Sequence, residues 1–237
     1  MIPTTAEQAC TRLRELSWRP NLGAAVINPG DPCYGEQDWF IFVRVPDTRR
    51  VAREFRDLPL SQIRKLLRSK IHEERLLALI ILVNRARKSS ERELAELSAF
   101  YIQHLDHVDN WDLVDTSAEH LLGAFLFTQP AALARTRLLD LARSSDLWRR
   151  RVGMVATFYY IRRGRFEETF AVADVLLNDE EDLIHKAVGW MLREVGNRNL
   201  RMEEAFLKPR YHDMPRTMLR YAIEKFPESK RQRYLRG

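Results

Sequence analysis

Apolar residues recur every three to four positions through most of the chain beyond Asp47, a spacing that predicts amphipathic helices. No segment has the alternation of a convincing strand, so the pattern predicts an all-α protein. The expected helices begin at Ser61 and then span about residues 71–88, 89–105, 116–127, 131–143, 147–163, 166–177, 180–195, 200–207 and 214–226.

The N-terminal part of the chain has a different pattern. Glycine and proline gather between Pro20 and Pro46, which indicates one long irregular region after an N-terminal helix. We therefore interpret residues 1–237 as one helical repeat domain in which residues 1–43 form a less regular helix and loop.

Small residues mark a repeat along the helical part. Ala78, Ala118, Gly153 and Gly189 lie near the start of alternate expected helices, separated by 40, 35 and 36 residues, each within an apolar run. Helix pairs of this period are typical of HEAT-like or armadillo-like solenoids, in which each pair buries its apolar face against its neighbours. An irregular helical bundle is the alternative.

Composition adds charge to this picture. Lys and Arg number 39 against 33 Asp and Glu, and 32 of the 39 are Arg, whose planar guanidinium suits phosphate oxygens. A hydrophobic content of 45% argues against disorder. Cys10 and Cys33 cannot form a disulfide framework, and no long apolar run or signal peptide is present, so we expect a cytoplasmic protein without membrane contact, and a monomer.

The repeat also sets a register of charges. Three residues before the small positions stand Arg75, Asp115, Arg150 and Lys186. Bases aligned on one face of a solenoid would form a track for a phosphate backbone. The single acid, Asp115, interrupts that track and is therefore a candidate functional residue.

Asp115 follows Trp111 by four residues, in Asn110-Trp111-Asp112-Leu113-Val114-Asp115. On a helix this spacing places an indole and a carboxylate on one face. The alternative is that Asp115 or Asp112 caps a helix beginning near Thr116.

The tryptophans Trp111, Trp148 and Trp190 recur with a similar period. Tryptophan at helical spacing usually belongs to a core, but charged residues adjoin or lie within one helical turn of each of these three. Aromatic rings interleaved with cations suit a nucleic-acid surface. Neither a metal-ligand cluster nor a cofactor motif is evident; His104 and His107 lack a third strong ligand fixed by spacing.

Several ordered blocks together resemble the AlkD-like DNA alkylation repair family, over a span from about residue 44 to the end. The blocks are Ile71–Leu79, Asn110–Asp115, Leu147–Arg151, Asp182–Gly196 and Met214–Pro227.

The resemblance implies a right-handed superhelix of HEAT-like repeats with a basic concave face. It also implies a DNA glycosylase that hydrolyses the N-glycosidic bond of cationic N3- or N7-alkylated purines in double-stranded DNA, without a cofactor. No lysine stands out for a Schiff base, so lyase activity is not expected.

The resemblance further assigns site residues. Asp115 matches the catalytic acid of the family, and Trp111 and Trp190 match aromatic residues that bracket the deoxyribose of the lesion. The expected DNA contacts are Arg151, Arg150, Lys186, Arg44 and Trp148.

One departure and two alternatives accompany this hypothesis. Before Val43-Arg44-Val45-Pro46, where relatives commonly carry a small glycine, this chain has Phe40-Ile41-Phe42. A noncatalytic HEAT-like module that binds DNA or protein is the rival function, and a helical scaffold whose basic face serves RNA is a third.

Overall fold

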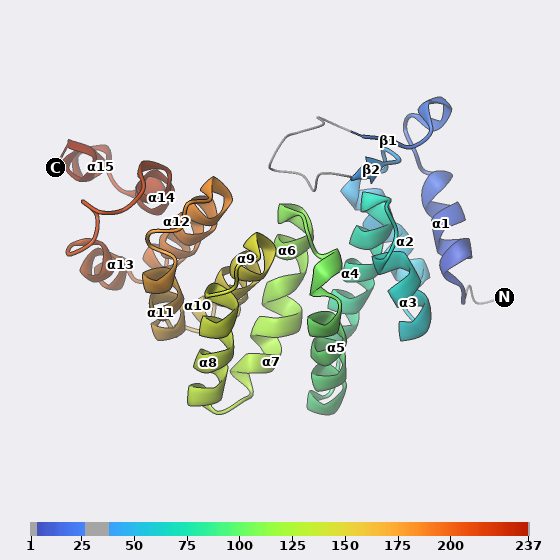
Figure 1. Cartoon of the computed structure of the whole chain (residues 1–237), viewed down its shortest axis with the longest axis horizontal. Coiled ribbons are helices and arrows are strands. Elements are labelled where there is room, and N and C mark those ends of the chain that lie inside the picture. The colour runs from blue at the N-terminus through green and yellow to red at the C-terminus, as the bar shows by residue number, and fades with distance from the viewer. Residues whose placement is uncertain (1–3, 27–37, 237) are drawn as a thin grey trace. The chain divides into compact units, whose positions relative to one another are not determined.

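The computed structural model describes residues 4–26 and 38–236, most of them in helices (Figure 1). The expectation of an all-α fold is confirmed, and the arrangement is consistent with an all-α repeat solenoid. The chain divides into two compact units, Met1–Leu121 and Leu122–Gly237, and each contains its own set of buried apolar residues. The interpretation as one continuous domain stays a prediction.

The described residues of the first unit form six α-helices. They are α1 (Ala6–Arg14), α2 (Val45–Glu54), α3 (Leu60–Leu67), α4 (His72–Ala86), α5 (Glu91–Gln103) and α6 (Trp111–Ala118). Short 3₁₀ turns lie at Pro20–Leu22 and Leu105–His107, and a π-helical turn follows α6 at Glu119–Gly123.

Helix α4 is the centre of the first unit, because α2, α3, α5 and α6 all pack against it. Its residues from Leu76 to Val83 are buried on every side, as expected of a helix that is apolar all round. The four residues before them, from His72 to Arg75, are polar and are buried as well. Buried polar groups require partners, so the first turn of α4 is where the fold must supply them.

A short strand pair interrupts the otherwise helical first unit, although no strand was expected. Strand β1 (Ala25–Val26) pairs antiparallel with β2 (Trp39–Phe40). Two residues per strand leave no room for a detectable alternation, which explains why the sequence pattern did not reveal them.

Phe42, just after β2, has a φ of 61°, in the left-handed region. This conformation costs a side chain with a Cβ about 1–2 kcal/mol and is the one for which glycine is preferred. A glycine at this position would relieve that strain.

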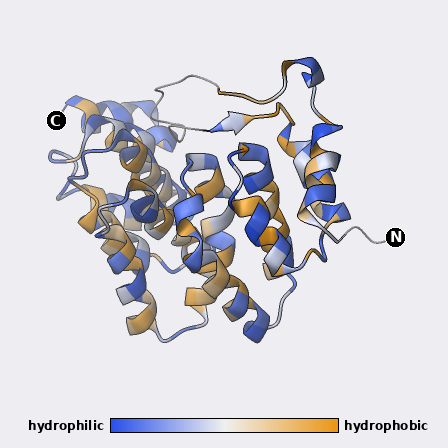
Figure 2. Cartoon of the chain, turned by 45° about the vertical axis from the view of Figure 1, so that its right-hand side comes forward, coloured by the Kyte–Doolittle hydropathy of each residue, from blue (hydrophilic) through white to orange (hydrophobic). Residues whose placement is uncertain are grey.

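The second unit contains the remaining helices. They are α7 (Ala124–Phe127), α8 (Ala131–Ala142), α9 (Leu147–Ala156), α10 (Phe158–Ile161), α11 (Glu167–Val175), α12 (Asp182–Gly196), α13 (Leu200–Leu207), α14 (Arg216–Ala222) and α15 (Glu228–Arg236). Apolar (orange) and polar (blue) residues are interspersed along the ribbon of the chain (Figure 2).

The small residues of the repeat allow close helix contacts in this unit. A Cβ on Gly189 of α12 would lie 2.4 Å from the carbonyl oxygen of Met218 in α14. A Cβ on Gly153 of α9 would lie 3.1–3.2 Å from atoms of α8. Helix α12 thus packs closely on α14, and α9 on α8, where a side chain would separate them.

Two of the expected helices differ clearly from the structure, and α2 and α15 were not among them. The helix expected at 116–127 begins five residues earlier and contains the π-helical turn, and the one expected at 147–163 divides into α9 and α10. Helix α15 was not expected at all, because its sequence is mostly polar. Cys33 lies outside the described residues, and among the described ones no helix is long and apolar enough to span a membrane.

Candidate functional site

Helix α6 carries Trp111 and Asp115. It begins at Trp111, and the buried Asn110 caps it by accepting a hydrogen bond from the backbone N–H of Asp112 at 3.4 Å. Thr116 lies in the second turn of this helix, so the alternative in which Asp115 or Asp112 caps a helix beginning at Thr116 is excluded.

Trp111 and Asp115 lie one helical turn apart, and therefore on one side of α6. Trp111 is 37% exposed, so its indole is not a core residue, while Asp115 is half-buried. Burial, together with the negative charge of Asp115, raises the pKa of the Tyr101 hydroxyl above its ordinary value. Asp115 therefore has a neutral phenol in its electrostatic environment.

The side chain of Asp112, which lies between these two residues in sequence, is bound by His72 of α4. Its Oδ2 lies 2.8 Å from Nε2 of His72, and the other ring nitrogen, Nδ1, lies 3.1 Å from Oδ2 of Asp38. Asp38 and His72 are buried, whereas Asp112 is half-buried. The ring of His72 also stacks on Phe40 at 4.7 Å between centroids. The imidazole is thus fixed both in its plane and at its two nitrogens.

Asp38 is the hub of this buried cluster. Besides His72 it accepts hydrogen bonds from the guanidinium of Arg75 and, at 2.8 Å, from the side-chain amide of Asn110. Arg75 also pairs with Asp109, which is more exposed. We call Asp38, His72, Arg75, Asn110 and Asp112 the acid–histidine cluster.

The acid–histidine cluster joins three parts of the sequence: the residue before β2, the first turn of α4 and the start of α6. Buried charges that are paired and hydrogen-bonded resist displacement, because removing either partner leaves the other uncompensated. The cluster therefore fixes the turn of α6 that carries Trp111.

The cluster also corrects one expectation. Arg75 was predicted to be a base in an exposed track, but it is only 5% exposed and its guanidinium is bound by two carboxylates. No local signal indicated this burial, because charged residues at the start of a helix are ordinarily exposed. Asp38 and His72 were not predicted to have a role.

Arg44 directly precedes α2 and is exposed. Within the described residues, no carboxylate lies within ion-pair distance of its guanidinium.

Helix α9 of the second unit carries Trp148, Arg150 and Arg151. Trp148 is half-buried. Arg150 pairs with Asp179 at 2.7 Å and donates hydrogen bonds to two backbone carbonyls. Arg151 is buried and donates to the carbonyl oxygen of Leu183 at 2.5 Å, which braces α9 against α12. Both arginines therefore have structural partners in addition to any role with DNA.

Helix α12 carries Lys186 and Trp190, which are both half-buried and again one turn apart. The Lys186 ammonium binds Asp182 at 2.7 Å and thereby lowers the pKa of that carboxyl. Trp190 packs edge-on against Phe158 at 5.7 Å between centroids.

The predicted site residues thus fall into small groups. Trp111 and Asp115 share α6 in the first unit, whereas Trp148, Arg150 and Arg151 share α9, and Lys186 and Trp190 share α12, in the second. The association of Asp115 with Trp190 and Arg151 stays a prediction from the resemblance.

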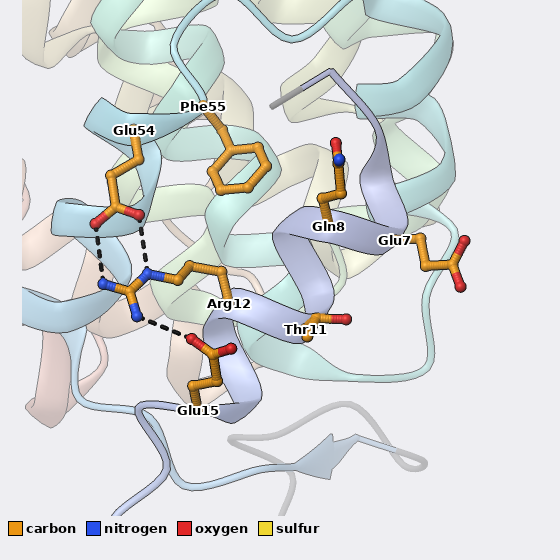
Figure 3. A pocket seen from close by; sticks show the side chains of 7 residues that line it. All are labelled: Glu7, Gln8, Thr11, Arg12, Glu15, Glu54 and Phe55. Atoms are coloured by element: carbon orange, nitrogen blue, oxygen red, sulfur yellow. Dashed lines mark hydrogen bonds and ion pairs between the residues drawn. The ribbon is translucent and has the colours of Figure 1, made fainter. Parts of the chain in front are cut away.

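A surface depression between α1 and α2 contains none of these residues (Figure 3). Its main charged group, Arg12, binds Glu54 and Glu15, both at 2.9 Å. Because Arg12 of α1 is bound to Glu54 of α2, the depression has the character of a structural contact between two helices.

Two comparisons show which known proteins the chain is similar to, and a third found no match. The model of a family described as DNA alkylation repair enzyme matches residues 24–226. A solved structure described as a predicted DNA alkylation repair enzyme from Enterococcus faecalis is similar with a TM-score of 0.62, covering 81% of this chain and 90% of that chain at 20% identity. This likeness supports the fold. The comparison with curated proteins gave no significant match.

Proposed function

The chain belongs to the family of DNA alkylation repair enzymes, and we propose that it is a DNA glycosylase that hydrolyses the N-glycosidic bond of cationic N3- or N7-alkylpurines in duplex DNA. Its family membership implies a role in alkylation repair and hence contact with DNA. The observation that supports the glycosylase proposal is the half-buried carboxylate of Asp115, one helical turn from the exposed indole of Trp111.

The chemistry requires few groups. A purine alkylated at N3 or N7 carries positive charge and leaves as a neutral base, so little general-acid assistance is needed. What remains is an oxocarbenium-like sugar, which an ionised Asp115 near C1′ would stabilise and toward which it would orient a water molecule. The electron-rich face of Trp111 would add a favourable contact with the cationic sugar. In this proposal Trp190 provides the second aromatic contact.

The remaining residues would bind the DNA backbone. Arg44 is the one predicted DNA contact in the first unit. Its side chain is exposed and has no carboxylate partner among the described residues. For Lys186 and Arg150 a phosphate would compete with Asp182 and Asp179, so we propose that each contributes less to affinity than a cation without such a partner. Trp148 and Arg151 complete the proposed contact set.

The test is release of base from a duplex that contains a single 7-methylguanine. Wild-type protein is expected to release the base and leave an abasic site, and Asp115→Asn to lower the rate about 100- to 1000-fold because the oxocarbenium loses its counter-charge. Base release is measured by chromatography, and strands are expected to break only after alkali, because no lyase step is proposed.

The matched control is Asp57→Asn, which removes a carboxylate that is 73% exposed and contacts only its neighbour Arg56. It should retain wild-type activity. Undiminished release by Asp115→Asn would overturn the mechanism, and DNA binding without any release by the wild type would instead favour the noncatalytic HEAT-like module.

A further inference from the structure

An exposed aromatic cluster lies in the connection between α1 and α2. Trp18 is 51% exposed, and its ring meets that of Phe42 edge-on at 5.9 Å between centroids. The guanidinium of Arg19 lies 4.3 Å from the centroid of Trp18 and 5.4 Å from that of Phe42. We call Trp18, Arg19 and Phe42 the aromatic platform; in sequence, Trp18 and Arg19 follow α1, and Phe42 lies between β2 and α2.

The platform is held firmly by the backbone. The N–H of Trp18 donates to the carbonyl oxygen of Phe42 at 3.2 Å. On either side of Phe42, the N–H groups of Ile41 and Val43 donate to the buried carboxylate of Glu73 at 3.0 and 3.2 Å. Ile41 and Val43 are buried while Phe42 is half-buried, so the platform is anchored from the core and open at its surface.

Phe42 occupies this position against the preference of its backbone. Its φ of 61° would be unstrained with glycine. Strain that a bulky side chain introduces at a surface is not explained by packing of the core, and such outliers concentrate at binding sites. The ring of Phe42 contacts Trp18 and Arg19. The strained backbone therefore keeps together the residues that form the platform.

The charge of the platform indicates the class of ligand. In the described part of the chain, neither Arg19 nor Arg44, two residues after Phe42, has a carboxylate within ion-pair distance. An exposed indole near guanidinium groups that have no carboxylate partner among the described residues suits a nucleobase that stacks while its phosphates bind the cations. Bases within a duplex present only their edges, so stacking on an indole requires an unpaired base.

We propose that the aromatic platform is a second DNA-binding site, which stacks an unpaired base of single-stranded DNA adjoining a duplex. The proposal rests on the DNA binding included in the proposed function but not on base excision. It assigns Trp18 as the stacking surface, Phe42 as the residue that orients it, and Arg19 and Arg44 as phosphate contacts.

The experiment compares the affinity of the full chain for two undamaged duplexes by fluorescence anisotropy. One is blunt, and the other carries a short single-stranded thymine overhang. Wild-type protein is expected to bind the overhang duplex about tenfold more tightly, the contribution of roughly one stacked base. Trp18→Ala and Phe42→Gly should each remove this preference and leave blunt-duplex affinity within about twofold.

Phe42→Gly is the informative variant, because it suits the left-handed backbone and should unfold at a temperature no lower than the wild type. Trp39→Ala is the matched control: it removes an exposed tryptophan of β2 outside the platform and should keep the preference.

If the wild type bound the two duplexes equally well, or if both platform variants kept the preference for the overhang, the proposal that the platform stacks an unpaired base would be wrong. Binding of neither duplex would overturn the proposed DNA binding as well. Loss of overhang preference with undiminished release of 7-methylguanine from a blunt duplex by Trp18→Ala is the expected combination, and it separates this site from the catalytic one.

Discussion

One buried acid in each unit shows two ways of burying a carboxyl group. In the first unit, the acid–histidine cluster gives the buried Asp38 three hydrogen-bond donors, on His72, Arg75 and Asn110. In the second, Glu203 of α13 is 1% exposed, and its Oε1 has no hydrogen-bond partner among the described residues. Asp38 is therefore well partnered, whereas Glu203 is nearly solitary.

The surroundings of Glu203 explain its state. Burial above all, and the neighbouring Glu204 in second place, raise the pKa of Glu203 to about 8, although Arg193 and Lys230 act to lower it. Its carboxyl group occupies the space beside Gly196, where a Cβ would lie 1.6 Å from Oε2. Glu203 is therefore expected to be largely protonated at neutral pH.

The comparison shows that burial alone does not determine how a carboxyl group affects the stability of the fold. A buried carboxylate with several donors can stay charged and position its neighbours, as in the cluster behind α6. One without donors becomes neutral and makes stability depend on pH. The following three predictions test this contrast.

The largest effect is expected from Asp38→Ala. It leaves the buried Arg75 and His72 without their shared carboxylate, so the free energy of unfolding should fall by about 3–5 kcal/mol, measured by urea denaturation. Asp109→Ala removes the other carboxylate on Arg75, which is 41% exposed, and should cost only about 0–1 kcal/mol. Equal losses in the two variants would contradict the distinction between a hub and a peripheral partner.

An intermediate effect is expected from Glu203→Gln, which keeps the shape of the side chain but cannot ionise. Because the folded pKa lies above the ordinary 4.5, the stabilisation is complete below pH 4.5 and is lost as pH rises toward 8. Between pH 5.5 and 7.5 the free energy of unfolding of the wild type should thus fall by about 1.4 kcal/mol per pH unit because of Glu203, or by about 3 kcal/mol in all. The variant should not show this fall.

The measurement is urea denaturation across that pH range, with Glu180→Gln, a change at an exposed carboxylate, as the control. If Glu203→Gln and Glu180→Gln gave the same dependence on pH, Glu203 would not be the solitary acid described above.

The smallest effect is expected from Gly196→Ala. The added methyl group overlaps the Glu203 carboxyl and should lower the free energy of unfolding by about 1–2 kcal/mol. In a Glu203→Ala background the same substitution should cost almost nothing, because the overlap is gone. If Gly196→Ala still lowered the free energy of unfolding in the Glu203→Ala background, the strain would lie in the backbone of α12 instead.

Much of the fold follows from local patterns in the sequence. The period of the apolar residues predicted the helices because it is a property of neighbouring positions, and the four-residue spacing placed Trp111 and Asp115 on one side of a helix. The start of α6 was missed because Asn110 is the cap, and a capping asparagine looks like any other polar residue beside a tryptophan.

The acid–histidine cluster could not be predicted in this way. His72 and Asp112 are 40 residues apart in sequence, and nothing local shows that their side chains meet. The same holds for Arg75, whose burial depends on Asp38, and for Phe42, whose left-handed backbone depends on contacts of its neighbours with α4. The roles of Asp115, Trp190 and Arg151 in catalysis stay predictions.

Glu73 has a consequence for how the first unit assembles. The amides of Ile41 and Val43 are protected by its carboxylate, not by a neighbouring strand, so their hydrogen exchange should report one side-chain rotation and not the opening of a sheet. These amides have their acceptor only while the first turn of α4 is formed. We therefore expect the segment that carries Phe42 to lose its order whenever that turn opens.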